Sequence, residues 1–288
     1  MDNFQDNQYI PFPSVLLDVR EENKTIKRFL VQLPDHLRQQ KIIPGQFFQL
    51  SAIGYGEIPI SVSDFDPEAG TIMFCIANTG SITTKFHQLS KDQLIGLRGP
   101  FGNGFPVTSF LGKNIVLLAG GIGLVPLRSV VSYFFRNPDA FNKIEILYGA
   151  KSTSDIIFRN EIKQWRLKPK TSFKMTIDNP EKGWSGNTGF VSNFLLSSYS
   201  EKSEILFAED PEFKNTKVLV VGPPAMYKSV FNALSDIHFP DKEVLLSLEN
   251  RMKCGIGKCG HCNCGSKYVC LDGPIFSWFE LKNLPKEY

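Results

Sequence analysis

Five of the six cysteines of this 288-residue chain lie in one run near its carboxyl end, CGIGKCGHCNCGSKYVC. Three of them, Cys254, Cys259 and Cys262, have the spacing C-x4-C-x2-C, and Cys270 follows after a gap of seven residues. This spacing is typical of thiolate ligands to a plant-type [2Fe–2S] cluster. Glycines within the run allow tight turns that bring several thiolates onto one inorganic core. The sequence therefore predicts an iron–sulfur site with these four cysteines as ligands.

Two other interpretations of the cysteine run stay open. A structural zinc site usually shows two separated pairs of ligands, whereas here three cysteines fall in one loop and the fourth follows closely. A disulfide framework needs an oxidising compartment, and the chain carries no sign of export. Cys264 places a fifth thiol beside the predicted ligands, and its simplest role is that of a free cysteine pointing away from the metal. Cys75, in the apolar stretch TIMFCIAN, is expected to be a buried strand residue.

The bulk composition is that of a globular protein and does not indicate nucleic acid or a membrane as a partner. With 288 residues, of which 42% are hydrophobic, the chain can bury two cores, so we expect two domains and a small cysteine-bearing module. A net charge of +3 is too small to imply nucleic-acid binding. The amino terminus lacks the basic and apolar regions of a signal peptide, and the longest apolar run, 115–127, is shorter than the ~18 residues that span a bilayer. We therefore expect a cytoplasmic protein.

The amino-terminal third predicts a β-rich domain. Short segments rich in Val, Ile and Phe are separated by turn-forming stretches, which indicates a small antiparallel barrel; they are SVLLDV, RFLVQL, QFFQLSAI, ISVSDF and TIMFCIA. One of these strands carries the hydroxyl of Ser61. Gly80 precedes a predicted helix whose first amides could attract a phosphate, although a plain helix cap is the commoner explanation of the sequence GSIT.

Strands and helices alternate from about Lys113 onward. NIVLLAG is a continuous apolar run, typical of a parallel strand that is buried on both faces. It leads into GGIGLVP and an amphipathic helix, and two further glycine turns, YGA and GPP, end neighbouring strands. Ligands bind at such strand ends in doubly wound sheets. The pattern predicts an α/β nucleotide-binding domain, with a tight strand-to-helix turn that binds no ligand as the alternative.

Taken together, these segments resemble the ferredoxin–NADP reductase superfamily over almost the whole chain. More narrowly, they are similar to flavin- and [2Fe–2S]-containing electron-transfer subunits. That group includes the gamma subunit of cytosolic NiFe hydrogenases (sulfhydrogenases), the B subunit of anaerobic sulfite reductase and, more distantly, the electron-transfer subunit of dihydroorotate dehydrogenase. The resemblance rests on motifs that share their order and spacing: GEIPISVSD, ANTGSIT, LRGPFGNGFP, LLAGGIGLVP, LYGAKSTSDIIF, VVGPPAMYK and ENRMKCGIGKCGHC.

The resemblance implies an architecture and a set of cofactor contacts. We expect an antiparallel β-barrel that binds FAD over residues 1–107, a doubly wound parallel-sheet domain that binds NAD(P) over 108–244, and a small [2Fe–2S] module with an aromatic tail over 245–288. Ser61 would lie near flavin N5 as the catalytic residue. The implied contacts are Pro59, Ile60 and Ser61 for the isoalloxazine; Gly80, Ile82 and Thr83 for the FAD pyrophosphate; Gly120, Gly121, Gly123 and Pro126 for the NAD(P) phosphates; Gly222, Pro223 and Met226 for the nicotinamide side; and Cys254, Cys259, Cys262 and Cys270 for the cluster.

The chain departs from the family pattern at three positions. The flavin motif often begins with arginine where this chain has Ile58, and an aromatic residue that often stacks on the flavin is replaced by Ile60. The cysteine that often precedes the G-P turn is Val221, so hydride transfer would depend on positioning rather than on a thiol. Lys85 and Arg98 are candidate substitutes for the missing arginine at the FAD phosphates, although an ordinary solvated surface position is the simpler interpretation of each.

The cofactors implied by the resemblance predict electron flow from NAD(P)H through FAD and the cluster to a partner subunit. A flavin exchanges two electrons with a nicotinamide and single electrons with a cluster, while the protein supplies orientation. We expect a gamma-type subunit of a NiFe hydrogenase, with catalytic and iron–sulfur subunits as partners. The alternatives are a sulfite reductase or dihydroorotate dehydrogenase subunit and, in a different class, a zinc-stabilised nucleotide-binding regulatory module.

Two details stay open at the level of the sequence. Lys151 and Arg159 follow a strand of the nucleotide-binding domain and could meet the 2′-phosphate of NADP, or could be ordinary surface residues. Phe276, Trp278 and Phe279 follow the cysteines closely. We expect these aromatic residues to cover the cluster and dock it on the barrel, with partner docking as the alternative.

Overall fold

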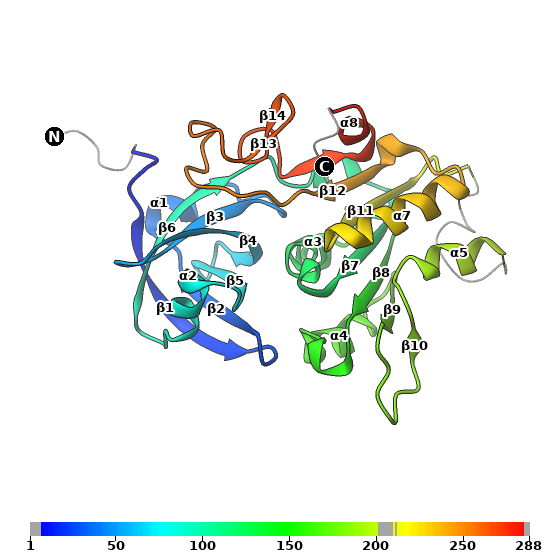
Figure 1. Ribbon diagram of the computed structural model, residues 1–288, viewed down its shortest axis with the longest axis horizontal. Helices are drawn as coiled ribbons and strands as arrows, with labels where there is room; N and C mark the ends of the chain where they lie inside the picture. Colours follow the sequence, from blue (N-terminus) through cyan, green and yellow to red (C-terminus); the bar gives the residue numbers. More distant parts are fainter. Residues whose placement is uncertain (1–6, 201–209, 211, 285–288) are drawn as a thin grey trace.

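The polypeptide forms a β-barrel and an open α/β sheet, and its cysteine-bearing segment lies against both (Figure 1). The computed structural model describes residues 7–200, 210 and 212–284. Residues 1–6, on which part of the expectation of no export signal rests, lie outside these ranges. Among the described residues, no helix has the length and apolar character needed to cross a bilayer.

Six antiparallel strands close the barrel in the order β1-β2-β5-β4-β3-β6. They are β1 (Phe12–Glu21), β2 (Ile26–Gln32), β3 (Phe47–Ala52), β4 (Gly56–Asp66), β5 (Thr71–Ala77) and β6 (Leu94–Phe101), with helices α1 (Asp35–Arg38) and α2 (Ser81–His87) in the connections. Apolar side chains, among them Phe29, Phe48 and Phe74, fill the interior. This arrangement confirms the predicted antiparallel barrel.

Seven strands form the second sheet in the order β10-β9-β8-β7-β11-β12-β15. All neighbouring pairs are parallel except the last, in which β15 runs antiparallel to β12. The strands are β7 (Asn114–Gly120), β8 (Lys143–Ala150), β9 (Thr171–Ile177), β10 (Asn187–Thr188), β11 (Thr216–Val221), β12 (Val244–Ser247) and β15 (Ile275–Ser277).

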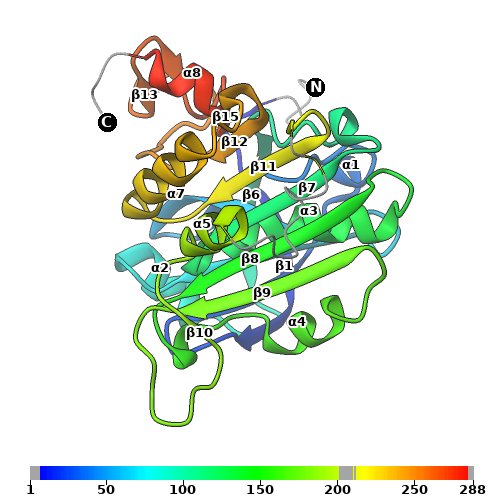
Figure 2. The ribbon, with the colours of Figure 1, turned by 90° about the vertical axis from the view of Figure 1, so that its right-hand side faces the viewer.

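Helices cover both faces of this sheet (Figure 2). The face toward the barrel packs on α3 (Leu124–Arg136) and α4 (Arg159–Trp165), and the opposite face packs on α5 (Asn193–Ser200) and α7 (Pro224–Asp236). Along β7, Ile115 and Leu117 join the first core, whereas Val116 and Leu118 join the second. Because successive side chains of a strand point to opposite faces, both sets must be apolar. The predicted doubly wound sheet is therefore confirmed.

Short single-turn helices connect several of these elements. They are η2 (Val107–Phe110) between barrel and sheet, η3 (Gly121–Gly123) before α3, η4 (Thr153–Asp155) after β8 and η5 (Asp241–Glu243) before β12.

The carboxyl-terminal part of the chain leaves the sheet and returns to it. Between β12 and β15, residues 248–274 carry the cysteines and a small hairpin, β13 (Asn263–Cys264) with β14 (Lys267–Tyr268); α8 (Trp278–Lys282) follows β15. The range 245–288, predicted as a separate module, therefore also contributes strands to the main sheet.

Candidate functional site

The barrel, the sheet domain and the cysteine segment meet around one cavity of about 320 Å³. The barrel side of its wall is formed by Pro59, Ile60 and Ser61 of β4 together with Thr83 of α2. The sheet domain contributes the turn at Ile122 to Pro126, and the carboxyl-terminal segment contributes Leu248 to Asn250, Met252 and Pro274. Five residues that the sequence predicts for two different cofactors, Pro59, Ile60, Ser61, Thr83 and Pro126, thus face one cavity.

The start of α2 has the geometry of a helix cap. The Thr83 hydroxyl accepts hydrogen bonds from the amides of Thr79 at 2.9 Å and Gly80 at 2.8 Å, and it donates to the Gly80 carbonyl. A Cβ atom at Gly80 would meet no heavy atom within 4 Å, so the backbone here is open to close approach. Ile82 lies beside the start of β4, since a Cβ at Gly56 would be 2.9 Å from its Cδ1. The plain cap that the sequence allowed is thus present, on an open edge of the helix.

The carboxyl ends of β7 and β11 meet through residues that have no room for larger side chains. A Cβ atom at Gly120 would lie 2.5 Å from Met226 Sδ and 3.0 Å from Pro223 Cδ, and one at Gly222 would lie 2.7 Å from Met226 Cε. At Gly123 a Cβ would stand 2.2 Å from the carbonyl oxygen at the end of β11. The two glycine turns predicted to hold one dinucleotide are therefore in contact. Such a backbone cradle at strand ends fits a nucleotide phosphate group.

The sulfur atoms of the cysteine loop receive hydrogen bonds from backbone amides. Cys254 Sγ accepts from the amides of Ile256 at 3.5 Å, Lys258 at 3.3 Å and Cys259 at 3.4 Å. Cys270 Sγ accepts from an amide of the same loop at 3.1 Å. Amides that point at sulfur stabilise thiolates and tune the potential of iron–sulfur clusters. The loop therefore fits an inorganic cluster in its donor atoms and in its surroundings.

The four predicted ligands differ in exposure and in acidity. Cys262 and Cys270 are buried with their sulfur atoms 3.2 Å apart, whereas Cys259 is exposed. Hydrogen bonds from the amides of His261 and Cys254 lower the pKa of the Cys259 thiol to about 7, while burial and the nearby Cys262 raise the pKa of Cys270 to about 12. In the described part of the chain, no three His, Cys, Asp or Glu side chains lie close enough together to hold one metal ion. Cys264 is buried, in the same apolar cluster as Cys262 and Cys270.

Arg98 holds the cysteine loop to the barrel. Its guanidinium is almost fully buried and forms a two-pronged ion pair with Glu57, with Nε–Oε1 at 3.0 Å and Nη2–Oε2 at 2.7 Å. Nη1 donates to the carbonyl of Cys254 at 3.1 Å and to that of Gln8 at 2.7 Å. The interpretation of Arg98 as a substitute ligand for the FAD phosphates is therefore wrong, because its donors are engaged within the protein. Lys85 is half-buried, with Nζ 4.5 Å from the centroid of the Tyr55 ring, and remains a candidate.

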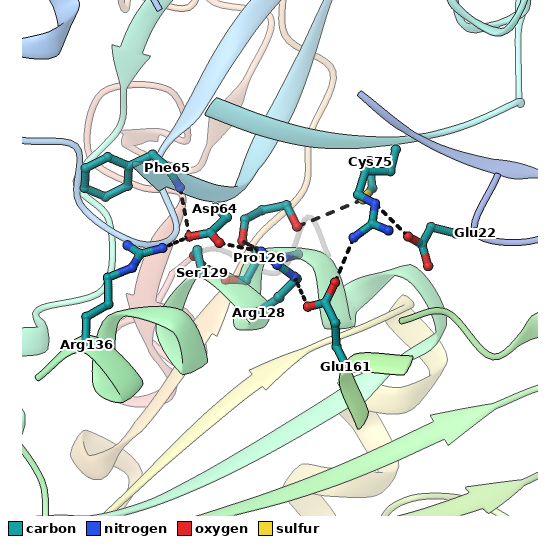
Figure 3. A network of polar contacts seen from close by, with 11 residues as sticks. Glu22, Asp64, Phe65, Cys75, Pro126, Arg128, Ser129, Arg136 and Glu161 are labelled. Atoms are coloured by element: carbon teal, nitrogen blue, oxygen red, sulfur yellow. Dashed lines mark hydrogen bonds and ion pairs between the residues drawn. The ribbon is translucent and has the colours of Figure 1, made fainter. Parts of the chain in front are cut away.

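A chain of largely buried charged groups joins the barrel to the sheet domain beside the cavity (Figure 3). Arg128 of α3 pairs with Asp64 of β4 at 3.0 Å and with Glu161 of α4 at 2.6 Å. The other oxygen of Glu161 pairs with Arg28 of β2 at 2.8 Å, and Arg28 also contacts Glu22 at 3.0 Å. Each buried charge here has a partner of opposite sign, and removal of one member would leave the other uncompensated. The network fixes how the two halves of the cavity face each other.

Some residues of the site escaped sequence reasoning. Phe47 of β3 lines the cavity and also packs in the apolar cluster of Cys262 and Cys270, so it lies between the cavity and the cysteine loop. Glu249 lines the cavity as well, and burial raises the pKa of its carboxyl group. Cys75 is buried as predicted, yet it too reaches the cavity wall. Phe47 and Cys75 come from strands that are distant in the sequence, and no local motif marks them as site residues. Glu249 opens the motif ENRMKCGIGKCGHC, but its residue type alone did not indicate a place in the cavity wall.

An acidic residue lies at the strand edge where the sequence offered only cations. Asp178 follows β9; its amide donates to the Ala150 carbonyl at 3.0 Å, and the next amide donates to the Lys151 carbonyl at 2.9 Å. Burial raises the pKa of Asp178. Lys151 is exposed beside it, while the guanidinium of Arg159 donates to the Thr153 carbonyl. The edge thus carries both signs of charge.

The aromatic residues after the cysteines separate into three environments. Phe276 is buried with the cysteines and the barrel residue Phe47 within one apolar cluster, as expected for a covering residue. Trp278 instead stacks on Phe231 of α7, with ring centroids 3.7 Å apart and planes at 11°. Phe279 is exposed, with the amino groups of Lys242 and Lys282 near its ring.

Comparisons with known proteins agree with this geometry. The oxidoreductase NAD-binding domain family matches residues 117–231, and the iron–sulfur cluster binding domain of dihydroorotate dehydrogenase B matches residues 249–282. The chain is 35% identical to sulfhydrogenase 1 subunit gamma of Pyrococcus furiosus, across 97% of this chain and 95% of that protein. It is 30% identical to a probable dihydroorotate dehydrogenase B (NAD(+)) electron transfer subunit of the same organism, across 91% and 89%.

A solved structure shares the fold. It is an NADH-dependent reduced ferredoxin-NADP oxidoreductase studied for flavin-based electron bifurcation, with a TM-score of 0.74 at 22% sequence identity. The superposition covers 96% of this chain and 93% of the other. The barrel, the parallel sheet and the cysteine segment thus form an arrangement already known in another oxidoreductase.

Proposed function

Because this chain belongs to the ferredoxin–NADP reductase superfamily, and within it to the flavin- and iron–sulfur-containing electron-transfer subunits, we propose that it carries electrons between NAD(P)H and a sulfhydrogenase-type partner. It is an NAD(P)H-linked oxidoreductase subunit with flavin and iron–sulfur binding regions. One observation carries the proposal: a single cavity is walled by the barrel, the nucleotide turn and the cysteine segment. Such a cavity places all three binding regions next to one another.

Residues on each wall would hold a different group. FAD would lie against Pro59, Ile60 and Ser61, with its pyrophosphate at Gly80, Ile82 and Thr83; NAD(P)H would occupy Gly120, Gly121, Gly123 and Pro126, with its nicotinamide near Gly222, Pro223 and Met226. Bound flavin supplies the exchange between paired and single electrons. The chain itself orients both partners and excludes water from the space between them. The side chain of Phe47 packs between this space and the cysteines that would bind the cluster.

We assign a [2Fe–2S] cluster to Cys254, Cys259, Cys262 and Cys270. The C-x4-C-x2-C spacing supports this assignment, as do the amides that point at two of the sulfur atoms. Cys264 is the fifth thiol of the run, and its burial in the apolar cluster supports a role in packing. A zinc-stabilised regulatory module remains the alternative of another class, and metal analysis separates the two.

Asp178 favours NADH over NADPH in this proposal. Acidic residues at the strand ends of nucleotide-binding domains accept a hydrogen bond from the ribose 2′-hydroxyl and repel a 2′-phosphate. Lys151 is the opposing influence at the same edge, since its carbonyl is bonded to the amide that follows Asp178. Reduction assays with NADH and NADPH in parallel measure which charge dominates.

The proposal as a whole is tested on the purified chain under anaerobic conditions. We expect about two iron atoms and one FAD per chain, a flavin-plus-cluster absorption spectrum, and bleaching of the flavin on addition of NADH. Affinity purification from the native source should then recover hydrogenase subunits. Zinc in place of iron would overturn the proposal, and recovery of dihydroorotate dehydrogenase or sulfite reductase subunits would replace the partner.

Replacement of Ser61 by alanine tests the predicted catalytic role. The hydroxyl lines the cavity, and a hydrogen bond from it to the reacting group contributes about 1 kcal/mol, which corresponds to a rate loss of roughly tenfold at most. Stopped-flow reduction of the flavin by NADH measures this loss, with FAD and iron content unchanged. Ser63→Ala is the matched control, because Ser63 lies on the same strand outside the lining of the cavity. Equal rates in the two variants would remove Ser61 from the mechanism.

A further inference from the structure

The cysteine segment has one side that is open to solvent. Cys259 is exposed, whereas Cys254 is half-buried and Cys262 and Cys270 are buried. The buried ligands face the barrel residue Phe47 within the same apolar cluster. An electron that enters from the cavity therefore arrives on the buried side of the loop. The shortest way to another protein is on the opposite side, at Cys259.

Two lysines and a leucine surround this exposed cysteine. Lys258 precedes Cys259 in the sequence, and Lys253 precedes Cys254, whose Sγ accepts a hydrogen bond from the Cys259 amide at 3.4 Å. Leu271 is 61% exposed and lies on the same loop, because a Cβ at Gly257 would be 3.0 Å from its Cδ2. We call these four residues, Lys253, Lys258, Cys259 and Leu271, the Cys259 face.

The positive charge of the Cys259 face is not neutralised by an ion pair among the described residues. Both lysine side chains are exposed, and neither forms an ion pair with any residue that the structure describes. Within the cysteine segment, Asp272 is already paired with Lys267 at 3.8 Å. Glu249, the other acid of the segment, belongs to the wall of the cavity. The face therefore presents uncompensated cations around an apolar side chain.

We propose that the Cys259 face is where electrons leave the chain and that the protein docked there presents carboxylates around an apolar contact. This inference rests on the proposed function, because it names the surface and the charge of the partner. Complementary charge accelerates encounter and fixes orientation between proteins, and its effect decreases steeply with ionic strength. An exposed leucine among cations gives such an encounter an apolar centre, as in protein interfaces generally.

Two haem proteins of opposite surface charge test the sign of the partner. The holoprotein is supplied with NADH and either acidic cytochrome b5 or basic cytochrome c; each NADH becomes NAD⁺ and a proton while two ferric haems become ferrous. For the variant Lys253→Glu/Lys258→Glu we expect cytochrome b5 reduction to slow by about tenfold or more at low salt. Cytochrome c reduction should become faster. Both differences should vanish near 1 M salt, where the Debye length is about 3 Å.

The control variant makes the same change of charge at a site far from the Cys259 face. Lys24 and Lys163 are exposed lysines of the β1–β2 turn and α4, on the opposite side of the molecule from the cysteine segment (Figure 1). Lys24→Glu/Lys163→Glu should leave both haem reactions within about twofold of wild type. The dissociation constant for cytochrome b5, measured by calorimetry, gives a readout that needs no turnover, and it should rise only in the first variant.

The outcomes separate this inference from the proposed function. Failure of NADH to bleach the flavin in the wild type would contradict the proposed function, while the calorimetric affinities would still test the surface. Normal flavin bleaching with equal cytochrome b5 affinity and rate in all variants would overturn the inference alone. Equal slowing by the distant pair would show a general charge effect and would also overturn it.

Discussion

Replacement of Gly123 by alanine is expected to abolish NADH-dependent flavin reduction and to lower the melting temperature by about 10 °C. The added methyl group would stand 2.2 Å from the Val221 carbonyl oxygen and 2.9 Å from the Gly222 amide nitrogen, both backbone atoms of the neighbouring turn. Backbone cannot move aside as a flexible side chain does, so β7 and β11 must separate where the nucleotide turns meet. Overpacking of this kind costs about 3 kcal/mol.

Gly121→Ala is the matched control two residues away. Gly121 has φ +54°, and the space that a methyl group would occupy there is open, so alanine is disfavoured only by backbone conformation, at about 1 kcal/mol. Thermal unfolding of both variants gives the comparison, because Gly121 is itself assigned to the NAD(P) phosphates and its replacement can slow flavin reduction for another reason. A Gly121 variant whose melting temperature falls as far as that of the Gly123 variant would contradict the steric explanation.

Replacement of Arg98 by methionine is expected to destabilise the protein by about 3 kcal/mol and to reduce the iron content of the isolated protein. The substitution leaves the Glu57 carboxylate without its ion-pair partner and removes the donor to the Cys254 carbonyl. The Glu57 side chain is 28% exposed, so we expect the lower end of the range for broken buried pairs. Chemical unfolding and iron analysis are the measurements.

A double variant separates the effect of the unpaired Glu57 carboxylate from the effect of the lost hydrogen bond to Cys254. Glu57→Gln/Arg98→Met carries no unpaired carboxylate, so the free energy of unfolding should recover in part. The iron content should stay low, because Cys254 still lacks its donor. Full recovery of iron in the double variant would show that Arg98 does not position the cysteine loop.

The pH dependence of the Arg98 effect follows from Glu57. Burial alone would raise the pKa of Glu57, but hydrogen bonds from Arg98 and Ser51 outweigh burial and hold its pKa below the ordinary value. A lowered pKa in the folded state contributes stability above the ordinary value and loses it as the pH falls through the folded pKa. The difference in stability between wild type and Arg98→Met should therefore narrow below about pH 4.

The sequence predicted the barrel and the parallel sheet because both depend on local patterns of apolar residues and glycines. The uninterrupted apolar run from Ile115 to Leu118 requires a strand covered on both faces, and the structure places its alternate residues in two cores. Short alternating segments likewise predicted the barrel. The glycine turns were recognisable because a strand end that meets another backbone has space for few residues other than glycine, as at Gly120 and Gly222.

Contacts between residues far apart in the chain could not be predicted from the sequence. Arg98 looked like a solvated or phosphate-binding cation, yet its partners Glu57 and Cys254 lie 41 and 156 positions away. Phe47 looked like any strand aromatic, although pairing with Ser61 puts it at the cavity. Ion pairs and shared walls of this kind depend on how distant strands are aligned, and neither residue type nor spacing reports that alignment.

The cysteine segment leaves the sheet at Leu248 and rejoins it at Pro274, and the amide of the first donates to the carbonyl of the second at 2.8 Å. Ser247 and Ile275, just outside, are paired in the sheet. The closure cost of a loop grows only slowly with its length, so these strands can accept excursions of very different size. Over evolutionary time, a metal-binding insert at this junction can be acquired, exchanged or deleted without shifting strand alignment. Grafting a loop with another electron carrier onto the same two anchor points is the corresponding route for engineering.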